Sequence, residues 1–277
     1  MSEMQVEMDP EDTVMRLWEA CDRWRSHAER FEQLAEVGFP EGSRGRADTA
    51  AAAVVEPPPV VSRYLQERAW NTVRMLRALH RWVFETEPGR LHLDPTVMYP
   101  LMRAALEDTA TIVWLQSPED SEARLSRALQ ALHQDQVYFA KNHLLLASTA
   151  AGLGGTASEM SEQLAAHIEE EKRAAGEYFA QLAERLGLDP RAVTGTLTTS
   201  APITTEYGAA SVERVTWGMM SDLSHFSFMM LRHLAESPIP GSTVPLLHAT
   251  MLQFGQTLNR VCDHAIAALE RSAAVSQ

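Results

Sequence analysis

The pattern of apolar and polar residues along the chain is that of a series of long helices. In the first of them, apolar residues recur at spacings of three and four from Val14 to Ala35, which is the heptad pattern of a helix that packs against another helix. Elsewhere, helix formers outnumber runs of β-branched residues. The pattern predicts an all-α protein, an antiparallel bundle of five to six long helices with an N-terminal helical arm.

The predicted helices begin where a capping side chain precedes a proline. Asp9-Pro10 opens the first helix, which should run to about Val37, and Asp94-Pro95 opens the third. Ser117-Pro118 opens the fourth in the same way. The other boundaries follow from Gly and Pro breaks, and they place helices at about 62–87, 117–151, 157–186, 206–235 and 242–272.

One segment near the N-terminus has no hydrophobic period. Residues 39–59 mix Gly, Pro and small side chains, which is typical of a flexible linker. This predicts an N-terminal helical arm over 1–38, a linker over 39–59 and a helical bundle domain over 60–277. A second polar stretch, the Thr-rich segment 194–205, is interpreted as a surface loop or a lid.

Charge and cysteine content narrow the classes of function. The formal net charge of −13 argues against loose binding to nucleic acid or to an anionic membrane, because such binding needs a net cationic face. Cys21 and Cys262 are too isolated to indicate a disulfide framework or a zinc site. The start of the chain lacks the pattern of a signal peptide, and no apolar run reaches the length of a membrane span. We therefore expect a cytoplasmic protein that needs no cofactor.

Charged side chains on the third predicted helix are the first candidates for function. Arg103 and Glu107 lie four residues apart on one face, beside apolar positions. A half-buried carboxylate is costly without a partner, so Glu107 needs a cation or a hydrogen-bond donor. Arg103 can supply one. Arg124 and Arg127 are also available if the third and fourth helices form a hairpin.

The sixth predicted helix carries the second set of candidates. Trp217, Ser221 and His225 line one face, and Asp222 lies three residues before His225. A histidine beside an acid can be a general base, a metal ligand or a satisfied core residue, and the sequence leaves these alternatives open. The predicted polar cluster, interpreted as a binding site, consists of Arg103, Glu107, Ser221, Asp222 and His225.

In these residues and their neighbours, the chain resembles a family of uncharacterised all-helical proteins common in actinobacteria, which is distantly similar to HEPN domains. The resemblance covers roughly residues 60–270. It rests on Tyr99, Pro100, Leu101, Arg103, Leu106, Glu107, Trp114, Leu115, Pro118, Arg124, Arg127, Trp217, Ser221 and His225. HEPN proteins are helical dimers, and their ribonucleases use an Arg followed four to six residues later by a His. Arg74 with His80 and Arg127 with His133 fit this spacing, which chance alone also produces.

The sequence favours a non-catalytic protein that binds a partner protein or a small ligand. A homodimer is expected, possibly through the helix from Val14 to Ala35. One alternative is a metal-independent ribonuclease that uses the two Arg and His pairs. Another is a di-metal oxidoreductase, although the Glu-x-x-His pattern of such proteins is missing. The substitutes that would have to converge as its ligands are Glu107, His167, Glu171, Asp222 and His225.

Overall fold

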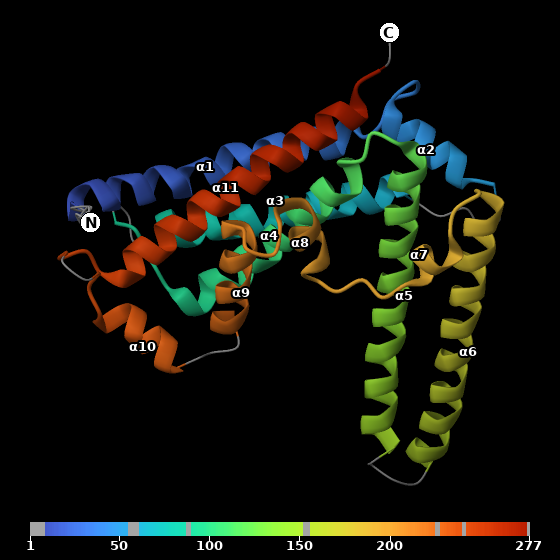
Figure 1. Ribbon diagram of the computed structural model, residues 1–277. Helices are drawn as coiled ribbons and strands as arrows, with labels where there is room; N and C mark the ends of the chain where they lie inside the picture. Colours follow the sequence, from blue (N-terminus) through green and yellow to red (C-terminus); the bar gives the residue numbers. More distant parts are fainter. Residues whose placement is uncertain are drawn as a thin grey trace. The chain divides into compact units, whose positions relative to one another are not determined.

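A computed structural model describes residues 9–54, 61–86, 90–151, 156–224, 228–239 and 242–275 of the chain. Within these ranges the secondary structure is helical, which confirms the all-α prediction (Figure 1). The helices are α1 (Pro10–Val37), α2 (Arg44–Ala52), α3 (Val61–Glu85), α4 (Pro95–Gln116), α5 (Ser121–Ala151), α6 (Thr156–Arg185), α7 (Pro190–Thr194), α8 (Ala201–Tyr207), α9 (Val212–Ser224), α10 (Phe228–Glu236) and α11 (Leu246–Ala273).

The helices group into two compact units, and each unit is assembled from separate stretches of sequence. The first unit comprises residues 1–38, 65–116 and 199–274, and the second comprises 39–64, 117–198 and 275–277. The first therefore holds α1, α4, α8 to α11 and most of α3, while the second holds α2, α5, α6 and α7. This division differs from the predicted arm, linker and bundle, because α1 shares a unit with helices of the predicted bundle.

The heptad face of α1 is filled within the first unit. Leu17, Trp24 and Phe31 are fully buried on it, whereas Val14 at its start stays 39% exposed. Across α1 and α11, the Asn259 Nδ2 group donates a 2.8 Å hydrogen bond to the Ala20 carbonyl oxygen. On the α3 side, the ring of Trp18 meets that of Phe84 edge-on, with centroids 4.7 Å apart. The sequence analysis allowed this face of α1 to pack against a second subunit. In the structure it packs against helices of its own chain.

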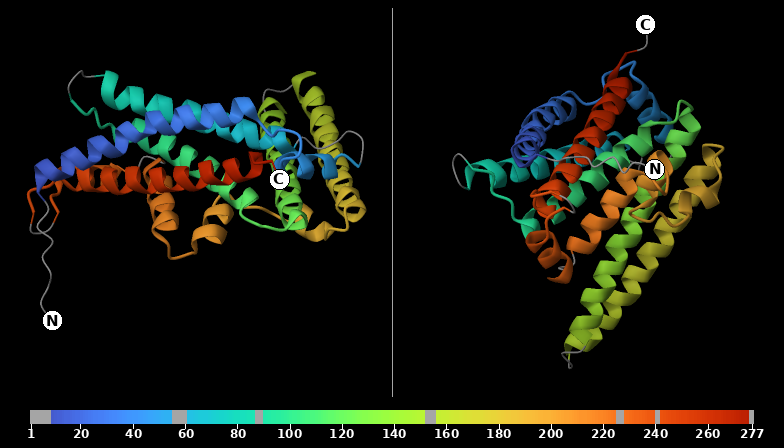
Figure 2. Two further views of the ribbon diagram at one scale, coloured as in Figure 1. Left: turned by 90° about the horizontal axis from the view of Figure 1, so that it is seen from above. Right: turned by 60° about the vertical axis from the view of Figure 1, so that its left-hand side comes forward.

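The first and last helices run in the same direction. Arg23 and Arg30 are seven residues apart on α1, and their ion-pair partners Asp263 and Glu270 are seven apart on α11, in the same order. Figures 1 and 2 show the two helices side by side. This pair is an exception to the antiparallel arrangement that we expected. Short loops impose antiparallel neighbours, and no short loop joins these two helices.

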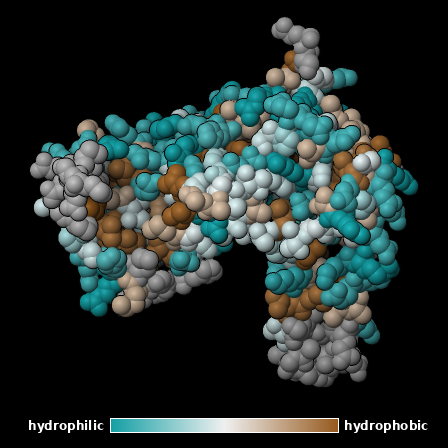
Figure 3. All heavy atoms as spheres, in the orientation of Figure 1, coloured by the Kyte–Doolittle hydropathy of each residue, from teal (hydrophilic) through white to brown (hydrophobic). Residues whose placement is uncertain are grey.

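The second unit is built on the antiparallel hairpin of α5 and α6 (Figure 2). Helix α7 packs against both of its members. The segment after α7 is hydrogen-bonded to α5, since the Leu197 N–H donates to the Gln134 Oε1 atom over 2.9 Å. Part of the Thr-rich segment is therefore fixed to a helix. Farther along the hairpin, Phe139 and Leu164 are 52% and 43% exposed, and Figure 3 shows apolar residues gathered on this stretch.

Two predicted elements differ from the structure. Residues 44–52 fall inside the predicted linker, yet they form α2, whose N-cap Ser43 accepts a hydrogen bond from the Arg46 N–H. The predicted helix over 206–235 is divided into the end of α8, then α9 and α10. Gly208 ends α8 with a φ of 92°, a conformation that only glycine adopts without strain. Among the described residues, no helix combines the length and apolarity that a membrane span requires.

Candidate functional site

Helix α4 presents Arg103 and Glu107 on a face that is only partly buried. Asp94 precedes the first residue of the helix, and its Oδ1 atom accepts a 2.9 Å hydrogen bond from the Thr96 N–H. Leu106 and Trp114 are buried, which fixes the rotation of the helix about its axis. The side chains of Arg103 and Glu107 keep 23% and 25% of their surface exposed. They lie at the border between the core of the first unit and solvent.

Helix α9 packs against α4 and presents Arg214 and Trp217 toward this border. Its first turn is capped by Ser211, whose Oγ atom accepts a 3.1 Å hydrogen bond from the Arg214 N–H. Met220 and Leu223 are buried three and six residues beyond Trp217, so Trp217 lies at the edge of the buried side of the helix. Because residues three apart on a helix are neighbours, Arg214 and Trp217 occupy the same stretch of its surface.

Glu107 joins the two helices through a single carboxylate oxygen. Its Oε1 atom accepts a 2.9 Å hydrogen bond from Arg103 Nε and a 2.7 Å hydrogen bond from Trp217 Nε1. The partner that the half-buried carboxylate needs is therefore supplied twice, once by its own helix and once by α9. The indole is held in one orientation as a result, since its only polar atom is bound.

Two guanidinium groups lie close to the same indole ring. The Cζ atom of Arg214 is 4.6 Å from the centre of the Trp217 ring, and that of Arg103 is 5.6 Å from it. Both distances are within the range of cation–π attraction. The neighbouring acid Glu213 is turned the other way, where its Oε1 atom binds Arg260 Nε over 2.9 Å. The cluster thus combines two guanidinium groups with one carboxylate.

The other predicted members of the cluster differ in their placement. Ser221 is half-buried one turn beyond Trp217, and within the described part of the chain its hydroxyl has no hydrogen bond to Glu107 or Arg103. Asp222 is exposed, and among the described residues it makes no ion pair with the cluster. His225 lies outside the described residues. Arg214, which the sequence reasoning missed, contacts the cluster directly. Its spacing of three from Trp217 is the signal that could have found it.

The Arg and His pairs expected of a ribonuclease have other partners. Arg74 donates a 2.7 Å hydrogen bond to Asn71 Oδ1, while the ring of His80 lies 4.7 Å from that of Phe84. In the second unit, Arg127 donates to Ser117 Oγ over 2.9 Å. His133 is buried there beside Phe179, and burial lowers its pKa below the usual value.

The candidate metal ligands are divided between the two units. His167 and Glu171 are exposed neighbours on α6, 3.3 Å apart in the second unit, while Glu107 and Asp222 belong to the first. Within the described ranges, no three His, Cys, Asp or Glu side chains come together as a possible metal site. His225, the remaining candidate, lies outside these ranges.

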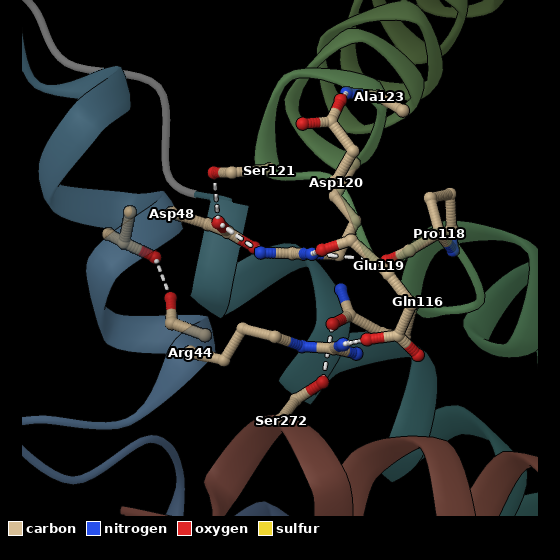
Figure 4. A network of polar contacts seen from close by, with 12 residues as sticks. Arg44, Asp48, Gln116, Pro118, Glu119, Asp120, Ser121, Ala123 and Ser272 are labelled. Carbon is tan, nitrogen blue, oxygen red and sulfur yellow. Dashed lines mark hydrogen bonds and ion pairs between the residues drawn. The ribbon is translucent and has the colours of Figure 1, made fainter. Parts of the chain in front are cut away.

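Arg124 is not a partner of Glu107. It is 4% exposed in the second unit, where its Nε and Nη2 atoms donate to the two carboxylate oxygens of Asp48 over 2.7 and 2.9 Å. Its Nη1 atom donates to the carbonyl oxygens of Pro118 and Glu119. Figure 4 shows Asp48 and Ser121 in this network, and the Ser121 hydroxyl donates to Asp48 over 2.7 Å. The arrangement closes the turn before α5 and fastens α2 to it.

Comparison with known proteins adds no assignment to this geometry. A scan against protein-family models, a search of curated proteins and a search of solved structures each found no match to the chain.

Proposed function

We propose that this chain is a non-catalytic helical-bundle protein that binds a partner protein through α9. The observation that carries the proposal is the Trp217 ring, held at the surface by Glu107 with two guanidinium groups beside it. Trp and Arg are the residues most enriched among those that dominate binding energy at protein interfaces. An ordered indole loses little conformational entropy when a partner covers it.

The exposed valines of α9 lie on another side of the helix. Val212 and Val215 are 39% and 53% exposed. They are five and two residues before Trp217, so they point about 140° and about 160° away from it around the helix axis. Single exposed valines are common on proteins and need no explanation. The apolar surface beside the two guanidinium groups is therefore the indole ring itself.

The HEPN-like relationship, a cytoplasmic location and a homodimeric state are further parts of the proposal. The heptad face of α1 is filled by its own chain, so a dimer would form through another surface. The α5–α6 hairpin offers one, since Phe139, Leu145 and Leu164 are each more than 40% exposed. Helical hairpins of this kind bury such faces by pairing into four-helix bundles.

Photo-crosslinking from α9 tests the proposed function. A benzoylphenylalanine placed in the full chain at Ser221, which is half-buried one turn beyond Trp217 on the same face, is expected to form a crosslinked product in cells, and the product should disappear when Trp217 is also changed to alanine. The same group at Val37, which is 71% exposed at the end of α1, serves as the control. Equal products from both positions, or none from Ser221, would show that this face of α9 is not the binding surface.

The Glu107→Ala variant should lower the free energy of unfolding by about 1–2 kcal/mol, because Arg103 and Trp217 both lose their acceptor. Glu107→Gln should cost less, since its amide oxygen can still accept from the indole. Chemical denaturation measures both. Glu236→Ala removes an exposed carboxylate that pairs with Arg232 on α10, and it should change stability by no more than about 0.5 kcal/mol. An alanine variant at 107 as stable as the parent would mean that the cluster does not connect α4 and α9.

A further inference from the structure

We propose that the start of α1 is a second docking surface, which binds a basic amphipathic segment of another protein. The segment places an apolar side chain against Trp18 and a Lys or Arg side chain beside Glu19. This inference does not depend on the proposed function of α9, because it concerns a different helix. It follows from an apolar pocket on α1, from the packing that holds Trp18 and from the acidic residues around it.

Large apolar side chains are exposed together on the first turns of α1. Val14, Met15 and Trp18 are 39%, 57% and 42% exposed. Val14 is four residues and Met15 three residues before Trp18, so they lie about 40° and about 60° to its two sides around the helix axis. Within the described part of the chain, the three side chains line an open pocket of about 630 Å³ together with Glu11 and Glu19. They form one apolar surface, unlike hydrophobic residues that are exposed singly.

Trp18 is ordered on this surface by the neighbouring helix. Its ring meets that of Phe84 on α3 edge-on, with centroids 4.7 Å apart, and His80 packs on the same Phe84 ring. One side of the indole is therefore fixed while the other stays exposed, so little conformational entropy is lost when a partner covers it. Met15 beside it is unbranched and adapts its shape to an incoming group. A rigid aromatic ring next to an adaptable side chain suits the binding of an apolar side chain.

The charge around the pocket is negative. Glu11 and Glu19 are exposed and line it, whereas the nearby Asp12 is paired with Arg16 over 3.7 Å. Glu11 lies in the first turn of α1, where an acid also stabilises the helix dipole. Glu19 lies beyond that turn, so the dipole does not account for it. Exposed acids are common on this chain, but these two border an apolar pocket, and a group that enters it arrives beside two carboxylates.

The sign of this charge decides which occupant fits. A second copy that paired through the same surface would bring Glu11 and Glu19 against the same two acids, and like charges facing each other across an interface disfavour association. The negative surface of an anionic membrane is opposed for the same reason. A segment that carries Lys or Arg close to an apolar residue gains from both features, because it fills the pocket and brings positive charge to its acidic border. A basic amphipathic segment is therefore the matching partner.

A peptide selection on the full chain tests this inference. Displayed peptides are selected on the parent and counter-selected on Met15→Asp, which places a charge in the pocket, and the affinity of the enriched peptides is measured by fluorescence polarisation. The enriched sequences should contain Lys or Arg close to an apolar residue. They should bind Glu19→Lys about tenfold more weakly than the parent, and salt should weaken their binding to the parent. Glu36→Lys makes the same charge reversal at an exposed site near the other end of α1, and it should bind like the parent.

Each contrary result overturns the inference. Enriched peptides without basic residues, or equal affinity for the parent and Glu19→Lys, would contradict the proposed charge. The absence of any enriched peptide would mean that the pocket is not a docking surface. Peptides that lose affinity with Trp217→Ala would place the binding on α9, whose proposed function would then stand without this one. A dimer of the parent that dissociates with Met15→Asp in sedimentation would make the occupant a second copy of this chain. Circular dichroism of each variant checks that it is folded.

Discussion

Replacing Asp48 by alanine is expected to lower the free energy of unfolding by about 3–5 kcal/mol, among the largest effects of any single substitution in this chain. The side chains of Asp48 and Arg124 are each only 5% exposed. Removing the carboxylate leaves a buried guanidinium without its counter-charge, and it also removes the acceptor of the Ser121 hydroxyl. Urea denaturation followed by circular dichroism measures the loss.

Two further variants separate the buried pair from the other contacts of the turn. Asp120→Ala removes only the acceptor of the Ala123 N–H at the start of α5, and it should cost about 0.5–2 kcal/mol. Changing Arg124 to methionine in the Asp48→Ala background removes the unpaired charge, so it should restore part of the stability. If Asp48→Ala lies within about 1 kcal/mol of the parent, Arg124 is solvated and the pair is not buried in solution.

Phe31→Ala should also lower the free energy of unfolding by about 3–5 kcal/mol, because it opens a cavity in the core of the first unit. Phe31 is fully buried on the heptad face of α1. Because this face packs on α11 and α3 of the same chain, the loss should be equal at low and high protein concentration. Thermal melts at two concentrations far apart measure this.

Val37→Ala is the matched control for Phe31. Val37 ends the same helix and is 71% exposed, so its replacement should change stability by less than about 0.5 kcal/mol. A melting temperature that rises with the concentration of the parent, but not with that of Phe31→Ala, would contradict the intramolecular packing. It would mean that the heptad face of α1 joins two subunits.

Hydrophobic periodicity was enough to predict most of the long helices, because each buries a continuous apolar stripe. Helix α1 begins at Pro10 and ends at Val37, where the sequence placed it. The short helix α2 could not be predicted in this way. Its residues carry no apolar stripe, and it depends on Ser43 at its start and on the contact of Asp48 with Arg124, which is 76 residues away. Only the folded chain brings that contact together.

The candidate site could be predicted in part. The physical argument that Glu107 needs a donor applies to any half-buried carboxylate, and the structure supplies Arg103 from the same helix. The second donor, Trp217 Nε1, is 110 residues away, so spacing along the chain gives no information about it. Arg124 seemed available as a partner of Glu107, because its helix α5 follows α4 along the chain. In the structure its guanidinium group binds Asp48 instead. Local periodicity fixes which face a residue occupies, whereas the partner across that face depends on how helices pack.

The parallel pairing of α1 with α11 bears on how the protein is made. Nascent chains leave the ribosome N-terminus first, so Trp24 and Phe31 emerge long before Phe254 and Leu258 are translated. Roughly 200 residues separate the two helices, and synthesis adds about 5–20 residues per second, so α11 is synthesised roughly 10–40 s after α1. Throughout that interval the apolar stripe of α1 lacks α11, the helix that covers it in the folded protein. We therefore expect the unfinished polypeptide to bind chaperones that cover exposed hydrophobic segments during translation.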